Sequence, residues 1–221
     1  LEYLENDSES QLIGAATDLG VVHNKRKVRL KNLVSLQFVP EAYDIALKGD
    51  EVSVGPRVTL TELRHFLKGK CDEYAKYLDI FASPQIKNNA TLVGNIANAS
   101  PIGDNAPALL ALNATVTLLS TKGEREVALS EFFLDYRKTA MRPGEIIKLI
   151  KFKLPKGNFR IFKTSIRKDL DISTVNLAVS FVTKDGKVEE LYIGAGGVAA
   201  TPLRLKKTEG SLVGKVLDKK T

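Results

Sequence analysis

The feature that most constrains this chain is a long polar segment, residues 83–104, without the periodicity of a helix or a strand. It contains four asparagines and one aspartate, and such side chains need hydrogen-bond partners when they are buried. Long segments of this kind in compact domains are functional or disordered. Leu92, Val93, Ile96 and Ile102 are spread through the segment, and this apolar content argues against disorder. The segment is therefore predicted to line a site for a polar ligand.

The flanking sequence predicts hairpins and irregularly spaced helices. Residues 48–50 and 184–187 have the composition of hairpin turns, and Thr59 with Glu62 matches the capping box that opens a helix. Strands are expected at residues 11–14, 51–54, 114–120, 125–129, 145–154, 159–166, 174–183 and 188–194. Helices are expected after residue 59 and at residues 71–80, 107–112 and 206–214. Strands and helices that do not alternate regularly indicate an α+β fold and not a parallel α/β fold.

Composition excludes several classes of protein. Among 221 residues, 43% are hydrophobic and 27% are charged, which is ordinary for a globular chain. No run of about 18 apolar residues is present, so no membrane-spanning helix is expected, and the N-terminus lacks the pattern of a signal peptide. The single cysteine favours a reducing, cytoplasmic compartment. One Cys and two His cannot form a Cys-rich zinc or iron–sulfur site, so no metal ligands are expected in this chain.

A loop of small residues, 14–20, is a second candidate binding segment. Ala15 and Ala16 are small enough to let the backbone approach a phosphate, and a helix that follows would add N–H donors. An ordinary turn before a helix explains the same pattern, because a single short motif of this kind is not specific.

A longer pattern within residues 83–104 is more specific, namely Ile86-Lys87-Asn88-x-Ala90-Thr91-x-x-Gly94-Asn95-Ile96-x-Asn98-Ala99-Ser100-Pro101-Ile102-Gly103-Asp104. It resembles the FAD-binding domain of the molybdenum hydroxylases, with the small subunits of xanthine dehydrogenases as the most similar group. Further stretches resemble the same family in the expected order, at residues 16–19, 132–147, 162–172 and 196–202. Collinear motifs that cover nearly the whole chain are far more specific than either loop alone.

The resemblance implies a two-lobed α+β FAD-binding fold of the vanillyl-alcohol oxidase type, followed by an incomplete α+β C-terminal domain. The expected first lobe is residues 1–51, truncated at its N-terminus, and the expected second lobe is residues 52–157. The C-terminal domain is expected over residues 158–221, after a break in composition at residues 155–158. FAD would lie extended between the two lobes.

The resemblance also implies which residues contact FAD. The pyrophosphate would be held by backbone N–H groups and one hydroxyl of Ala15, Ala16, Thr17, Asp18 and Leu19. The phosphate and ribitol would be contacted by Thr91, Gly94, Asn95, Asn98 and Ser100. Asp104 would accept from the adenosine ribose hydroxyls. The flavin would be approached by Ile146, Ile147 and Lys163, with Tyr136 and Arg137 as weaker candidates.

At two positions the sequence departs from the family's pattern. Ala15 and Val93 stand where glycine is usual. A Cβ at either position is expected to crowd the pyrophosphate or to shift the loop, so the departure concerns FAD affinity more than the fold.

The function implied by the resemblance is electron transfer. In the family, electrons leave a molybdenum centre, pass iron–sulfur clusters and reach FAD, which reduces NAD. The cofactor carries this chemistry, so no catalytic side chain is expected in this chain. The molybdenum cofactor and the iron–sulfur clusters would belong to partner subunits or missing segments of the same enzyme, and neither nucleic acid nor a membrane is expected as a partner.

Two other functions are compatible with parts of the sequence. Residues 194–199 nearly fit the G-x-G-x-x-A pattern of an NAD(P)-binding Rossmann unit, although Pro202 interrupts the helix that should follow; a glycine bulge at a strand end is the alternative. Residues 24–27, with Arg29 and Lys31, form a basic run in a chain of net charge +7. This run is compatible with nucleic-acid binding, but it lacks interleaved aromatic residues, which favours a solvated loop.

Three further side chains are weaker candidates. His23 and His65 could attach a flavin covalently, and a surface or structural role is the simpler interpretation of both. Cys71 stands at an expected helix start, where a thiol can be reactive, but a packing role is commoner.

Overall fold

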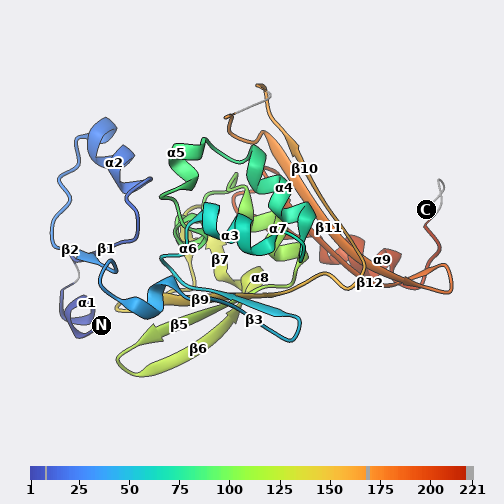
Figure 1. The fold of residues 1–221 in the computed structure, drawn as a ribbon, viewed down its shortest axis with the longest axis horizontal. Helices are drawn as coiled ribbons and strands as arrows, with labels where there is room; N and C mark the ends of the chain where they lie inside the picture. Colours follow the sequence, from blue (N-terminus) through green and yellow to red (C-terminus); the bar gives the residue numbers. More distant parts are fainter. Residues whose placement is uncertain (8, 168–169, 218–221) are drawn as a thin grey trace.

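The central part of the chain, residues 45–153, forms a five-stranded antiparallel sheet, the central sheet, which is covered by helices on one face (Figure 1). The computed structural model describes residues 1–7, 9–167 and 170–217. The strand order is β3-β4-β9-β5-β6. These strands are β3 (Ile45–Lys48), β4 (Glu51–Val54), β5 (Thr115–Ser120), β6 (Gly123–Ala128) and β9 (Ile146–Lys153). The predicted turn at residues 48–50 is confirmed, because Lys48 pairs with Glu51 across the β3–β4 hairpin.

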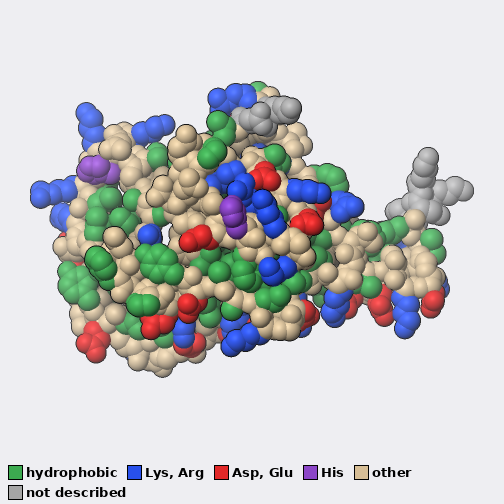
Figure 2. All heavy atoms as spheres, viewed as in Figure 1, with side chains coloured by type: hydrophobic (Ala, Val, Ile, Leu, Met, Phe, Trp, Pro, Cys, Tyr) green, Lys and Arg blue, Asp and Glu red, His purple; other side chains and the backbone are tan. Residues whose placement is uncertain are grey.

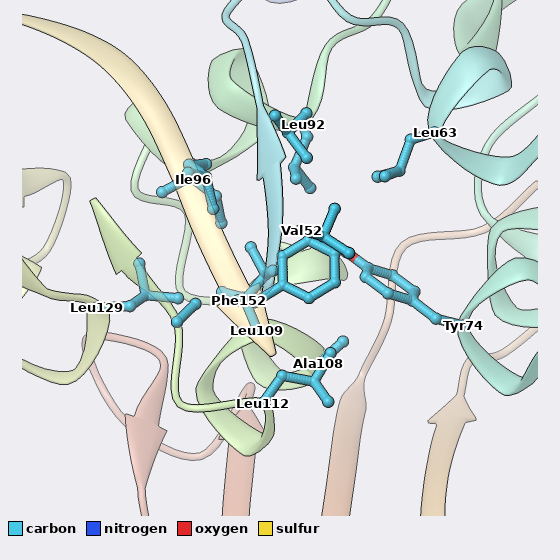
Figure 3. Close-up of a cluster of buried hydrophobic side chains, with 14 of the residues drawn as sticks. Val52, Leu63, Tyr74, Leu92, Ile96, Ala108, Leu109, Leu112, Leu129 and Phe152 are labelled. Carbon is cyan, nitrogen blue, oxygen red and sulfur yellow. The ribbon is translucent and has the colours of Figure 1, made fainter. Parts of the chain in front are cut away.

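Five helices of this central part contribute buried apolar side chains to the core beside the sheet. They are α3 (Leu60–Leu67), α4 (Asp72–Ile80), α6 (Leu92–Ala97), α7 (Asn105–Ala111) and α8 (Leu129–Phe132). The short helix α5 (Pro84–Lys87) lies between α4 and α6 in the chain and contributes no residue to this core. Side chains from β4, β9 and the five helices converge in one core (Figure 3). At its centre the rings of Tyr74 and Phe152 meet edge to face, with their centroids 6.2 Å apart. A small hairpin of β7 (Phe133–Asp135) and β8 (Lys138–Thr139) follows α8.

The expectation that residues 83–106 lack regular structure is wrong in part. Residues 83–106 contain α5, α6 and the start of α7. Helices of four and six residues are too short to show a 3.6-residue periodicity, and their ends are instead fixed by side-chain caps from Ser83 and Thr91. The capped helix expected after Thr59 is confirmed. The Thr59 hydroxyl accepts the Glu62 N–H at 3.2 Å, and the Glu62 carboxylate accepts the Thr59 N–H at 2.8 Å.

A second, four-stranded sheet packs on the other side of these helices (Figure 1). It contains β10 (Asn158–Thr164), β11 (Val175–Lys184), β12 (Lys187–Gly196) and β13 (Leu203–Arg204). Helix α9 (Lys206–Leu212) packs on it near Val188 and Ile193. Phe159 and Ala178 on the opposite face belong to the main core. The predicted strands and the closing helix of this part are confirmed.

The Rossmann alternative is wrong. Strand β12 is antiparallel to both of its neighbours, and the next element after residues 194–199 is strand β13, not a helix. These glycines serve close packing, because a Cβ at Gly194 would clash with the Pro107 carbonyl of α7, and a Cβ at Gly196 would clash with the Asn176 amide of β11.

The N-terminal segment lies beside the helices, on the side opposite to the four-stranded sheet (Figure 1). Its elements are α1 (Glu2–Asn6), β1 (Gln11–Ile13), α2 (Leu19–Arg26), β2 (Leu33–Ser35) and the 3₁₀ helix η1 (Pro40–Tyr43). Strands β1 and β2 form a two-stranded parallel sheet. The expected lobe boundary after residue 51 falls within β4. It would therefore separate β3 from most of β4, although the two strands are hydrogen-bonded to each other in the central sheet. The mixed architecture confirms the expected α+β class.

Candidate functional site

A groove separates the N-terminal segment from the N-terminal end of α6. It consists of two adjoining cavities of about 590 and 480 Å³. Both are lined by Leu12, Gly14, Thr91, Gly94 and Ala97, so they form one elongated depression. The groove therefore lies where the small-residue loop 14–20 and the polar segment 83–104, distant in sequence, approach each other.

The first wall of the smaller cavity is the loop that leads from β1 into α2. Ala15, Ala16, Thr17, Asp18 and Leu19 all line it. Ala16 adopts a left-handed conformation with φ of 59°, which turns the backbone sharply. Within the part of the chain that the structure describes, the backbone N–H groups of residues 15–18 have no hydrogen-bond acceptor. A run of unpaired N–H groups beside a cavity is a natural cradle for an anion.

The second wall is the start of α6. The Thr91 hydroxyl caps the helix by accepting the Gly94 N–H at 3.0 Å. Gly94 is exposed to the groove, and a Cβ there would lie only 3.0 Å from the Thr91 hydroxyl oxygen. Because Gly94 has no side chain, the Thr91 cap is undisturbed and the floor of the groove stays open.

A hydrogen bond between Asn98 and Asp18 connects the two walls, and a second hydrogen bond orients Asn95 within one of them. The Asn98 amide donates to the Asp18 carboxylate at 3.3 Å, across 80 positions of sequence. Asn95 lines the groove, and its amide oxygen accepts from Asn105 at 3.1 Å. Asn105 in turn accepts the Tyr74 hydroxyl proton at 3.0 Å within the core. Asn95 is therefore oriented by a hydrogen-bond chain that begins in the buried core.

The part of the larger cavity that lies beside the start of β9 is mainly apolar. Ile146 and Ile147 at the start of β9 line it, together with Met141 and Val93. Glu145 borders the same cavity, and Arg125 binds its two carboxylate oxygens at 2.7 and 2.8 Å. The hydrogen bond from Arg125 lowers the pKa of Glu145 below its ordinary value. This carboxylate is thus held ionised and neutralised by its partner.

Asp104 and Lys163 lie outside the groove and contact each other. The Lys163 ammonium donates to the Asp104 carboxylate at 2.7 Å, and the two side chains are 6% and 8% exposed. Asp104 also accepts from Ser173 and, at 3.2 Å, from Asn176. Lys163 donates to the Asp171 carbonyl at 2.8 Å as well. The pair joins α7 to the four-stranded sheet, and neither residue lines either cavity.

Ser100 and the two weaker candidates, Tyr136 and Arg137, also lie away from the groove lining. The Ser100 carbonyl accepts the Gly103 N–H at 3.0 Å in the turn before α7. Tyr136 and Arg137 are exposed on the β7–β8 turn, with the Arg137 guanidinium 6.0 Å from the centroid of the Tyr136 ring. Neither cavity is lined by any of these three residues.

Sequence reasoning missed several parts of the groove. Leu12, Leu36 and Pro56 line it, and the Arg57 guanidinium donates to the Gly14 carbonyl at its centre. Apolar residues at strand ends and an arginine before a helix carry no local signal of a binding site. Their part in the groove follows from contacts across more than 40 positions of sequence.

The remaining candidate residues, His23, His65, Cys71 and the basic run, do not line the groove. His23 and His65 are exposed, and the His23 ring contacts the Val28 carbonyl at 2.9 Å. Cys71 is buried at the start of α4, and burial raises the pKa of its thiol to about 11, which opposes thiolate reactivity. The basic run around Lys25 is exposed on α2 and the loop after it, and Figure 2 shows Lys and Arg side chains at the surface over this end of the molecule. Within the described residues no group of His, Cys, Asp and Glu side chains is placed to hold a metal ion, and no helix is long and apolar enough to cross a membrane.

Comparisons with known proteins agree with this geometry. Residues 1–156 match the family described as the FAD binding domain in molybdopterin dehydrogenase, and residues 160–221 match the CO dehydrogenase flavoprotein C-terminal domain. The chain belongs to this flavoprotein family.

Relatives within the family include proteins much longer than this chain and solved chains of which it covers most. A xanthine dehydrogenase of Oryza sativa is 32% identical over 227 residues, which are 95% of this chain and 17% of the relative. The chain thus spans about one sixth of the length of such relatives. The solved structure of a reconstituted CO dehydrogenase from Oligotropha carboxidovorans superposes with a TM-score of 0.92 at 28% identity, covering 99% of this chain and 78% of that one. Quinoline 2-oxidoreductase from Pseudomonas putida 86 superposes with a TM-score of 0.88 at 25% identity, covering 100% and 78%.

The residues present in this FAD-binding domain fit a dinucleotide with a diphosphate bridge. The unpaired N–H groups of residues 15–18 match an anionic group, and Gly94 leaves room for close approach of a ligand. The cavity that contains Ile146 and Ile147 offers the apolar surface that a planar ring system needs. Val93 packs in the main core with its side chain 5% exposed and borders the larger cavity, and it does not line the smaller cavity beside the 15–18 loop.

Proposed function

We propose that this chain holds FAD along the groove and acts as the electron-transfer flavoprotein of a molybdenum hydroxylase. The observation that carries the proposal is the juxtaposition of unpaired N–H groups on the 15–18 loop with the capped, side-chain-free start of α6. FAD supplies the redox chemistry, since it takes up electrons singly and releases them as a hydride. The protein binds and orients the cofactor and restricts its access to water.

Each part of the groove has a role in this proposal. The N–H groups of residues 15–18 and the Thr17 hydroxyl hold the diphosphate, with Thr91, Asn95 and Asn98 on the opposite wall. The isoalloxazine ring lies against Ile146 and Ile147, in the apolar end of the groove. The Arg125–Glu145 pair keeps that end of the groove in place by anchoring the turn before β9.

The electron donors and the acceptor belong to the larger enzyme. Because the described residues offer no ligand set for a metal, we place the iron–sulfur clusters and the molybdenum cofactor on other domains or subunits. We propose NAD as the acceptor, on the strength of the similarity to xanthine dehydrogenases over 95% of the chain.

Titration of the purified chain with FAD tests the binding site. We expect saturable quenching of flavin fluorescence and co-elution of FAD with the protein. Gly94→Val should weaken binding strongly, because the added side chain fills the groove floor, whereas Gly210→Val on the distant helix α9, where a Cβ meets no neighbour, should not. Equal affinity of the Gly94 variant and the original chain would contradict the proposed site.

Anaerobic mixing of the FAD-loaded chain with NADH tests the acceptor. The expected result is loss of the visible flavin absorbance, by transfer of a hydride from NADH and uptake of a proton from solvent. Reduction by dithionite but not by NADH would leave the FAD site standing and would overturn NAD as the partner.

A further inference from the structure

The charged side chains that line the groove are all acidic, which is unusual for a site that receives a diphosphate. They are Glu5, Asp7, Asp18 and Glu145. Glu145 is neutralised by Arg125, but no lysine or arginine is among the described residues that line either cavity. An anionic ligand therefore needs a cation placed just behind the lining.

Arg57 occupies such a position. It lies between β4 and α3, immediately after the groove residue Pro56, and its backbone N–H donates to the Ala42 carbonyl at 2.7 Å. Its guanidinium donates to the carbonyl of Gly14, one of the residues that line both cavities. The side chain thus connects the rigid end of β4 to the first residue of the 14–20 loop.

Tyr43 holds the guanidinium in this position. The Arg57 guanidinium lies 5.4 Å from the centroid of the Tyr43 ring, and its Nε donates to the Tyr43 hydroxyl at 3.3 Å. The Tyr43 hydroxyl in turn donates to the Gln37 carbonyl at 3.0 Å. Ordering of a long side chain before the ligand arrives reduces the entropic cost of binding.

The charge of Arg57 is not neutralised by the protein. Among the described residues, no carboxylate lies within ion-pair distance of its guanidinium, although several other arginines have such partners. Of its five N–H donors, the contacts with Gly14 and Tyr43 use two. An unpaired cation with free donors beside an acidic, anion-binding groove has a clear use in attracting the ligand.

We propose that Arg57 is a positioning residue for the diphosphate of the cofactor. It orients the 14–20 loop through the Gly14 carbonyl, so that the N–H groups of residues 15–18 face the groove, and its charge offsets the acidic lining. This inference rests on the proposed FAD site and adds to it a cation that sequence comparison of the two loops does not reveal.

The test compares FAD affinity and its salt dependence in the full chain with Arg57→Ala, Arg57→Gln and Arg57→Lys. Arg57→Ala should raise the FAD dissociation constant about tenfold, as expected for loss of a charged hydrogen-bonding group. It should also flatten the dependence of that constant on salt, because a screened attraction has been removed. Arg57→Lys should retain the salt dependence and recover part of the affinity, whereas Arg57→Gln should recover neither. Arg64→Ala, which removes a surface arginine paired with Asp79, is the matched control.

The outcomes separate this inference from the function on which it rests. If the original chain binds no FAD, the proposed function fails. If it binds FAD and Arg57→Ala binds it equally well with the same salt dependence, the role of Arg57 is overturned and the FAD site stands. If Arg57→Ala does not fold, Arg57→Gln decides, since a merely structural role would leave its salt dependence unchanged, whereas loss of the charge should flatten it.

Discussion

The ion pair of Asp104 and Lys163 shows how a residue can carry a family pattern and yet have a structural partner. The family resemblance implies that both side chains approach the cofactor. In the structure the two side chains contact each other at 2.7 Å, across 59 positions of sequence, at the junction between α7 and the four-stranded sheet, and their contact with the cofactor stays a prediction. A sequence pattern identifies such residues as special, but it cannot tell which neighbour satisfies them.

Replacement of Lys163 by Met should therefore destabilise the protein. It leaves the Asp104 carboxylate buried without its cation, and loss of one partner of a buried pair costs about 3–5 kcal/mol. Thermal or urea unfolding of the chain measures the effect. The double variant Asp104→Asn/Lys163→Met should lose less stability than the two single changes added together, because no uncompensated charge remains.

Lys148→Met is the matched control for this prediction. Lys148 pairs with Glu124 on the exposed face of the central sheet, where the two side chains are 41% and 46% exposed, so its loss should cost less than about 1 kcal/mol. An Asp104→Asn variant with unchanged stability and weakened FAD binding would instead favour the ribose contact that the family resemblance implies.

At the scale of elements, two threonines cap helices in the same way, but only one of them also lines the groove. Thr59 opens α3 and Thr91 opens α6, each by accepting the N–H of the residue three positions later. The Thr59 capping box is fully local, which is why the sequence alone predicts it. The sequence does not predict helix α6, because its six residues are too few for a periodic pattern, although its cap belongs to the segment that the sequence marks as functional.

Substitution of each threonine by Ala should separate capping from binding. Both variants should lose about 1 kcal/mol of stability, the usual cost of a missing N-cap. Only Thr91→Ala should also weaken FAD binding, because Thr91 lines both cavities and Thr59 lines neither. Denaturation curves and FAD titrations of the same two proteins measure both effects. An equal loss of FAD affinity in the two variants would show that the change acts through general stability.

The same contrast explains how much of the fold could be predicted. Hairpins such as β11–β12 are defined by turn residues adjacent in sequence, and their strands were predicted closely. The groove depends on contacts such as Asn98 with Asp18 and Arg57 with Gly14, which join distant segments. Sequence patterns identified both walls of the groove but not the side chains that hold the walls together.

At the scale of the whole molecule, the N-terminal segment is weakly attached to the rest. Among the described residues up to residue 41, only Leu36 is buried, and helix α2 has no buried residue at all. Its links to the central part are few polar contacts, such as those of Asp18 and Gly14 with the groove walls and of Glu5 with Thr121 and Lys122. A two-stranded parallel sheet such as β1–β2 contributes little stability by itself. The groove therefore runs along the interface where the N-terminal segment contacts the central part of the molecule.

FAD that contacts both walls should consequently hold the segment in place. A ligand at a concentration about 100 times its dissociation constant stabilises the bound state by about 2.7 kcal/mol. Amide hydrogen exchange in β1 and β2 that requires the segment to separate from α6 should then slow by up to about 100-fold. The β11–β12 hairpin provides the internal control, since it lies in the C-terminal sheet and lines neither groove cavity, and its exchange should not change. Unchanged exchange in β1 and β2 with FAD bound at saturation would mean that the cofactor contacts only the α6 wall, and that the 15–18 loop does not hold its diphosphate.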